Sequence, residues 1–162
     1  MANNVYSTIK FVKGDHEAER EFIRIFEFIE TYEERSLEFS DFFRTNQEIV
    51  DQEFMETWVG PRKAYITKFM GTEVEVKSAW ISPHVFLFNL IEHLRDFDPD
   101  IKISMAYEDE FLNFAGVYVN EKNQEESGGW FKEQFDQRAI DDDFLGFVEE
   151  AVNIWEEELI CD

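Results

Sequence analysis

Acidic side chains recur at a seven-residue spacing near the end of the chain, and this spacing suits them to binding rather than to catalysis. One series is Asp142, Glu149 and Glu156, and a second is Asp143, Glu150 and Glu157. Seven residues make nearly two turns of an α-helix, so each series forms a stripe with steps of roughly 10 Å. The spacing predicts a double row of carboxylates along one helix. Duplex DNA also presents closely spaced negative charges, so such a row could occupy a DNA- or RNA-binding groove on another protein.

A second acidic face is predicted on an earlier helix, over residues 15–35. Glu27, Glu30 and Glu34 lie three and four residues apart there. Like charges at this spacing cost a few tenths of a kcal/mol per pair, roughly, so helix stability does not explain them. We take both acidic faces as a candidate surface for a basic partner. The alternative is that both faces are simply solvated and keep the protein soluble.

The side chains that most often carry catalysis or bind metals are poorly placed. His84 and His93 are nine residues apart, so they lie on opposite sides of a helix and cannot share a metal. Cys161 is the penultimate residue, where a chain usually frays. The acidic runs 108–110 and 141–143 lack the spacing of a calcium loop. We therefore expect a non-catalytic protein without a metal or a cofactor.

The formal net charge of −22 in 162 residues excludes several classes of partner. Residues 15–56 hold 14 acids against 4 bases, and residues 121–162 hold 14 acids against 3 bases. A surface of this sign repels nucleic acids and membrane phosphates, and it attracts basic proteins. We expect no direct contact with nucleic acid or membrane.

The rest of the composition indicates a folded protein in a reducing compartment. The chain is 44% hydrophobic and contains 18 phenylalanines, which is enough apolar surface for a core. The single cysteine excludes an internal disulfide and a zinc site built of thiolates. The first residues carry no signal-peptide pattern, and no apolar run is long enough to span a membrane. We expect a cytoplasmic location.

Residues 64–83 give the clearest prediction of structure. Two β-rich runs, 63–70 and 72–80, flank Gly71 and predict a hairpin with a tight turn. Trp80 stands at the corner after the second strand, and Ser82-Pro83 predicts the start of a helix over about 83–95.

The remaining elements follow from the same periodicities. An alternating strand is predicted at 4–12, a helical insertion at 36–62, two further strands at 101–107 and 111–119, a polar linker at 120–129 and a helix from about 142 to 160. The expected apolar face of this last helix consists of Phe144, Val148, Ala151, Trp155 and Leu159.

The predicted order is β-α-(insertion)-β-β-α-β-β, followed by the acidic helix. Its first six regular elements match the ferredoxin-like split β-α-β pattern, an α+β fold with two helices on one face of an antiparallel sheet. We expect one domain over 1–120, with the linker and acidic C-terminal helix of 121–162 packed on it.

Three segments also resemble a known family. They are MANNVYSTIKFVKG, TEVEVKSAWISPHVFLFNLIEHL and ISMAYEDEFLNFAGVYV, within residues 1–14 and 63–120. The segments resemble the YubB-type ferredoxin-like domain of the Api92-like group of small phage and plasmid proteins. The resemblance implies the ferredoxin-like fold and a phage or plasmid origin, and it implies no activity.

Three functional hypotheses follow. The first is a phage-type acidic protein, like a DNA mimic, that occupies the basic surface of a host DNA- or RNA-handling protein, with Trp130 and Phe131 among the anchors. The second is a structural module that self-associates into a homo-oligomer, with its charge serving solubility. The third is a hydrolase with an unrecognised carboxylate site.

Overall fold

The computed structural model describes residues 3–27, 35–37, 51–138 and 143–162, and its fold is α+β. Within these residues the strands form one antiparallel sheet in the order β2-β3-β4-β1-β5-β6-β7. The strands are β1 (Asn4–Lys13), β2 (Arg35–Ser36), β3 (Ala64–Phe69), β4 (Glu73–Ala79), β5 (Lys102–Asp109), β6 (Phe114–Val119) and β7 (Lys122–Ser127). The helices are α1 (His16–Phe26), α2 (Gln52–Trp58), α3 (His84–Arg95), α4 (Gly128–Arg138) and α5 (Phe144–Cys161).

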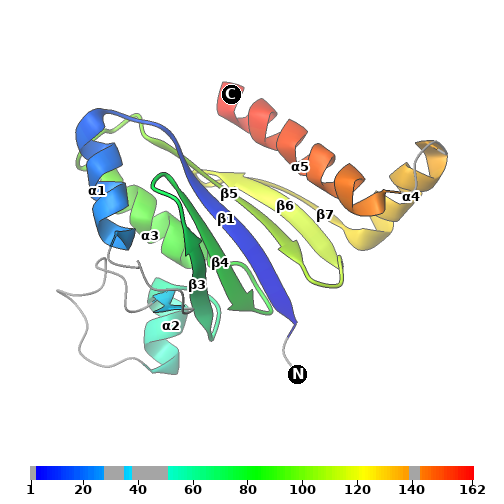
Figure 1. Cartoon of the computed structure of the whole chain (residues 1–162), viewed down its shortest axis with the longest axis horizontal. Helices are drawn as coiled ribbons and strands as arrows, with labels where there is room; N and C mark the ends of the chain where they lie inside the picture. The colour runs from blue at the N-terminus through cyan, green and yellow to red at the C-terminus, as the bar shows by residue number, and fades with distance from the viewer. Residues whose placement is uncertain (1–2, 28–34, 38–50, 139–142) are drawn as a thin grey trace.

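The larger core lies between the sheet and the helices α1 and α3. Val5 and Ile9 of β1 point into it and are fully buried, as their two-residue alternation predicted. The ring of Phe26 on α1 lies 5.2 Å from that of Phe22 and 6.1 Å from that of Phe86 on α3, measured between centroids. This core fixes two helices on one face of the sheet, as the sequence predicted (Figure 1).

The hairpin of β3 and β4 forms as predicted, around Gly71 with a φ of +69°. Only glycine adopts this conformation without strain, and no other atom lies near the position of a Cβ there.

The predicted helix cap at Ser82 is wrong. Helix α3 begins at His84, its N-cap position is Pro83, and no side chain forms a capping hydrogen bond there. Trp80 does stand at the corner, with a φ of +70° and 52% of its surface exposed.

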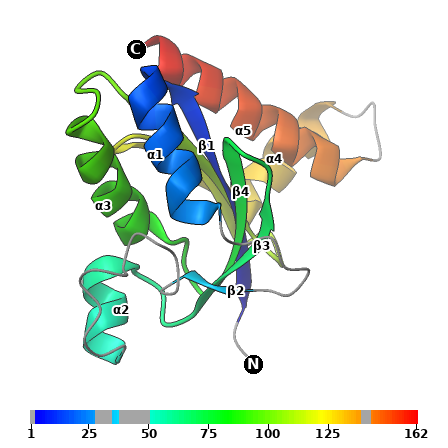
Figure 2. The same cartoon turned by 60° about the vertical axis from the view of Figure 1, so that its left-hand side comes forward.

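The helices α4 and α5 pack on the opposite face of the sheet, against β5 and β6. Ala115 and Val117 of β6 form a second core there with Phe131 of α4 and Val148 of α5. The C-terminal helix is therefore docked on the domain, and the prediction of helices on one face holds only for α1 and α3. Figure 2 shows α5 and α1 separated by the sheet.

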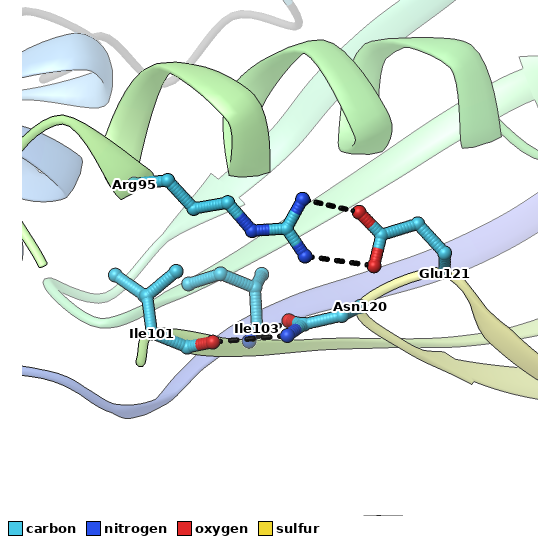
Figure 3. Close-up of polar contacts among 5 residues, drawn as sticks. All are labelled: Arg95, Ile101, Ile103, Asn120 and Glu121. Atoms are coloured by element: carbon cyan, nitrogen blue, oxygen red, sulfur yellow. Dashed lines mark hydrogen bonds and ion pairs between the residues drawn. The ribbon is translucent and has the colours of Figure 1, made fainter. Parts of the chain in front are cut away.

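The predicted linker at 120–129 is a strand. Residues 122–127 form β7, which pairs with β6 through a two-residue turn at Asn120 and Glu121. The Asn120 side chain continues the pairing with β5: its Nδ2 donates to the Ile101 carbonyl at 2.9 Å, and its Oδ1 accepts from the Ile103 amide at 2.9 Å (Figure 3). Arg95 of α3 joins the same turn through two contacts with the Glu121 carboxylate, at 2.6 and 2.9 Å.

The first helix and the insertion also have different boundaries in the structure from those predicted. The first helix does not reach residue 35, because Arg35 and Ser36 form β2 and pair with β3. Within 36–62 the structure describes the short helix α2, capped by Asp51, whose carboxylate accepts from the Phe54 amide at 2.8 Å. Helix α2 lies within the predicted helical insertion, and residues 38–50 of that insertion lie outside the described residues. None of the described helices is long and apolar enough to cross a membrane.

Candidate functional site

The acidic helix α5 is held on the sheet by polar contacts as well as by its core. The hydroxyl of Ser104 on β5 donates to the Glu156 carboxylate at 2.6 Å, and both side chains are buried. The Lys102 ammonium group donates a hydrogen bond to the Ile160 carbonyl in the last turn of the helix. These contacts orient α5 and decide which of its acids reach solvent.

The orientation of α5 differs in part from the predicted one. Val148 is buried as predicted, but Phe147 and Val152 are also buried, whereas the predicted Phe144, Ala151, Trp155 and Leu159 are only half-buried. The buried side of the helix is therefore rotated relative to the predicted face. In this orientation Glu156 meets Ser104, 52 residues away in sequence, and periodicity within the helix cannot reveal that contact.

The first predicted carboxylate stripe, of Asp142, Glu149 and Glu156, is wrong because α5 turns one of these acids toward the sheet. Glu156 is 8% exposed and bonded to Ser104, so it cannot contact a partner. Glu149 is exposed, and Asp142 lies outside the described residues. Only one described member of this series is therefore available on the surface.

The second stripe remains on the surface. Asp143, Glu150 and Glu157 are all exposed. Asp143 also caps α5, because its carboxylate accepts from the Gly146 amide at 2.9 Å. Helix α5 contains no lysine or arginine, so Glu150 and Glu157 have no basic neighbour within the helix.

The two predicted acidic faces do not form one surface. Glu27 is exposed at the C-terminal cap of α1, on the face of the sheet opposite α5. Glu30 and Glu34 lie outside the described residues. The acids of α1 and α5 therefore cannot contact one flat partner surface together, although both contribute to the long-range field.

A groove that the sequence did not predict runs between α5 and the sheet. We call it the α5 groove, a hollow of about 250 Å³ lined by Tyr6 and Thr8 of β1, Ala106, Tyr107 and Glu108 of β5, and Glu149, Val152 and Asn153 of α5. Tyr6 and Glu108 are directly paired across the two strands. The alternation of β1 does place Tyr6 and Thr8 opposite the buried residues, but no pattern within the strands reveals that α5 closes one side.

In the α5 groove, the charge of Glu149 disfavours the ionised form of Glu108. Partial burial raises the pKa of the Glu108 carboxyl, and the negative charge of Glu149 raises it further. Neither side chain forms a hydrogen bond or an ion pair within the described ranges. A bound cation would lower the free energy of both carboxylates. Among the described residues no three histidine, cysteine, aspartate or glutamate side chains converge as metal ligands would.

The other side of β5, β6 and β7 carries a polar and aromatic cluster that serves structure. The hydroxyl of Tyr107 donates to Glu125 at 3.0 Å and accepts from Asn123 at 2.8 Å. Burial raises the pKa of this hydroxyl, so it stays protonated. His84 stacks on Tyr118 with its ring plane tilted by 8°, and its Nδ1 lies 3.0 Å from the Ser82 carbonyl. These contacts anchor the β6–β7 hairpin to α3.

The remaining predicted residues are scattered. His93 lies 3.6 Å from Glu21 on the α1 side, far along α3 from His84. Cys161 is exposed at the end of α5. Trp130 and Phe131, the expected anchors of a partner, belong to the second core, and Phe131 is fully buried there. Phe131 is therefore not available as an anchor, whereas Trp130 is only partly buried.

Comparisons with family models, with curated proteins and with solved structures gave no match for this chain. The function must therefore be inferred from the geometry and the charge of the chain itself.

Proposed function

We propose that this protein is a phage-type acidic binding protein that modulates a host nucleic-acid-handling protein by occupying its basic surface. The observation that carries the proposal is the exposure of Glu149, Glu150 and Glu157 on one helix that contains no basic residue. With a net charge of −22, the chain attracts a basic surface over a distance and repels nucleic acid itself.

The rigidity of α5 supports this function. Its core residues and the bond between Ser104 and Glu156 hold the helix in one position before any partner binds. A partner therefore meets carboxylates whose backbone is already ordered, and binding loses less conformational entropy than it would with a flexible acidic tail.

We also infer that the β1-α1-β3-β4-α3-β5 part of the chain is a ferredoxin-like unit. The support is the antiparallel order β3-β4-β1-β5, with α1 and α3 on one face. In this interpretation β2, β6, β7, α4 and α5 are additions around the unit. The phage origin in the proposal rests on the resemblance of residues 1–14 and 63–120, not on the geometry.

Affinity capture with DNA competition tests the function. We expect the immobilised protein to retain basic proteins from a bacterial lysate, and both duplex DNA and salt to release them, because the DNA competes for the same basic surface. The variant with Glu149→Gln and Glu157→Gln should lose this retention. A variant with Glu17→Gln and Glu53→Gln removes the same charge from α1 and α2 and should keep it.

Two outcomes would contradict the proposal. One is retention that duplex DNA does not reduce. The other is an equal loss in both variants, which would mean that overall charge alone attracts the captured proteins.

A further inference from the structure

The α5 groove exists because α5 covers only part of its face of the sheet. The helix packs on β6 and β5, and the next strands, β1, β4 and β3, have no described helix on that side (Figure 1). The groove therefore lies at the boundary between the covered and the uncovered part of the sheet. One wall is a helix, and the floor is the exposed side of β5 and β1.

The floor of the groove carries an aromatic ring and a carboxylate, and the wall carries a second carboxylate. Tyr6 is 45% exposed and lies beside Glu108, because the two residues are paired across β1 and β5. Side chains paired in this way stand about 5 Å apart, so the aromatic ring and the carboxylate are neighbours. Glu149 reaches the same groove from α5 and brings a second carboxylate.

Two exposed apolar side chains lie near the N-terminal end of α5 and the end of β5. Leu145 precedes Glu149 by one helical turn, so both lie on the same side of the helix, and Leu145 is 58% exposed. Phe111, just beyond the end of β5, is 69% exposed and lines a separate cavity with Phe144. Exposed aromatic and aliphatic side chains beside a charged groove are typical of a protein contact.

Among basic side chains, arginine matches this groove best. Its planar guanidinium can donate to two carboxylates at once, and its face can stack on a tyrosine ring. A lysine ammonium is a more strongly hydrated point charge and has no flat face to stack.

We propose that the α5 groove binds an arginine side chain of an extended basic segment in the partner, between Glu108, Glu149 and Tyr6. This inference rests on the proposed function and adds the position of the contact and the side chain it recognises. The acids on the outer side of α5, Glu150 and Glu157, then contribute attraction over a distance rather than a fitted contact.

Titration of the full chain with nona-arginine tests the proposal by isothermal calorimetry. The groove variant carries Glu108→Gln and Glu149→Gln, and the matched control carries Glu150→Gln and Glu157→Gln, with the same net charge. We expect the groove variant to bind about tenfold more weakly than the wild type, and the control to change by no more than about threefold. Urea unfolding of both variants verifies that they are folded.

A second measurement separates a fitted contact from general attraction. Replacing Tyr6→Ala changes no charge, and it should weaken nona-arginine binding several-fold while leaving nona-lysine binding nearly unchanged. Equal effects of Tyr6→Ala on the two peptides would overturn the assignment to arginine.

The outcomes distinguish the two proposals. If the wild type binds nona-arginine but the groove variant and the control weaken equally, the groove proposal fails and the proposed function stands. If the wild type binds neither peptide, the proposed function fails, and the groove proposal fails with it.

Discussion

Ser104 and Glu156 meet across the interface between β5 and α5, with the serine hydroxyl 2.6 Å from a carboxylate oxygen. Both side chains are buried, although the spacing of Glu156 in the sequence places it in an acidic stripe with Glu149. The acid therefore helps to dock the helix, and its neighbours in the helix carry the surface charge. One hydrogen bond thus links the stability of the domain to the direction in which α5 presents its acids.

Removing the hydroxyl should destabilise the fold. Ser104→Ala leaves a buried carboxylate without its donor, and we expect a loss of about 1–3 kcal/mol in the free energy of unfolding. Glu156→Gln should cost less, because the amide oxygen still accepts from Ser104. Urea unfolding measures both, with the exposed substitution Glu157→Gln as a control that should change stability by less than about 0.5 kcal/mol. A Ser104→Ala protein as stable as this control would contradict the docking role.

Gly116 provides a test of packing in the β5–β6–β7 region. A Cβ at this position would lie 2.5 Å from the Gln124 carbonyl oxygen and 2.7 Å from the Tyr107 hydroxyl. We expect Gly116→Ala to cost about 2 kcal/mol or more, because backbone must move to relieve the contact. Gly129→Ala is the matched control: a Cβ there meets only Ser127 Oγ at 3.7 Å, and stability should not fall. Equal stability of the two variants in thermal unfolding would contradict the close approach.

The ion pair of Arg95 and Glu121 should depend on pH. The hydrogen bond from Arg95 lowers the pKa of the Glu121 carboxyl. Its contribution to stability is therefore present above the unfolded pKa of about 4.3, and it is lost as the pH falls through the lower folded value. The pair is exposed, so a double-mutant cycle with Arg95→Gln and Glu121→Gln should give no more than about 1 kcal/mol at neutral pH. A coupling energy that persists unchanged at pH values well below the folded pKa would contradict this assignment.

The contribution of Glu108 to stability should depend on pH in the opposite direction. The pKa of the Glu108 carboxyl is higher in the folded protein than in the unfolded chain. Its contribution to the free energy of unfolding is therefore stabilising below the unfolded pKa, and that stabilisation is lost as the pH rises through the folded pKa. Glu108→Gln should therefore stabilise the protein at neutral pH by up to about 0.5 kcal/mol, and this gain should vanish below about pH 4. In an NMR titration, Glu149→Gln should lower the pKa of Glu108. An unchanged pKa would show that the two carboxylates do not interact.

Much of the fold can be predicted because its signals are local. The alternation of Val5 and Ile9 marks β1, and Gly71 between two β-rich runs marks the hairpin of β3 and β4. Strand β7 was missed because residues 122–127, KNQEES, contain no apolar side chain. The strand forms because it pairs with β6 and because the Asn120 side chain and Arg95 fix the turn before it.

The site is harder to predict because it depends on contacts between distant segments. The sequence predicted an acidic helix near the C-terminus, and Glu149, Glu150 and Glu157 are exposed on it. It did not reveal that Ser104 would bury Glu156. The α5 groove also depends on where the helix crosses the sheet, so the meeting of Tyr6, Glu108 and Glu149 is visible only in three dimensions.

The salt dependence of nona-arginine binding to the wild-type protein tests the central claim most directly. If the acids of α5 and its groove bind a basic surface, the dissociation constant should rise by about tenfold or more as the salt concentration increases from about 50 to about 300 mM, because salt screens exposed charges. An affinity that stays the same over this range, or no binding at low salt, would contradict the account.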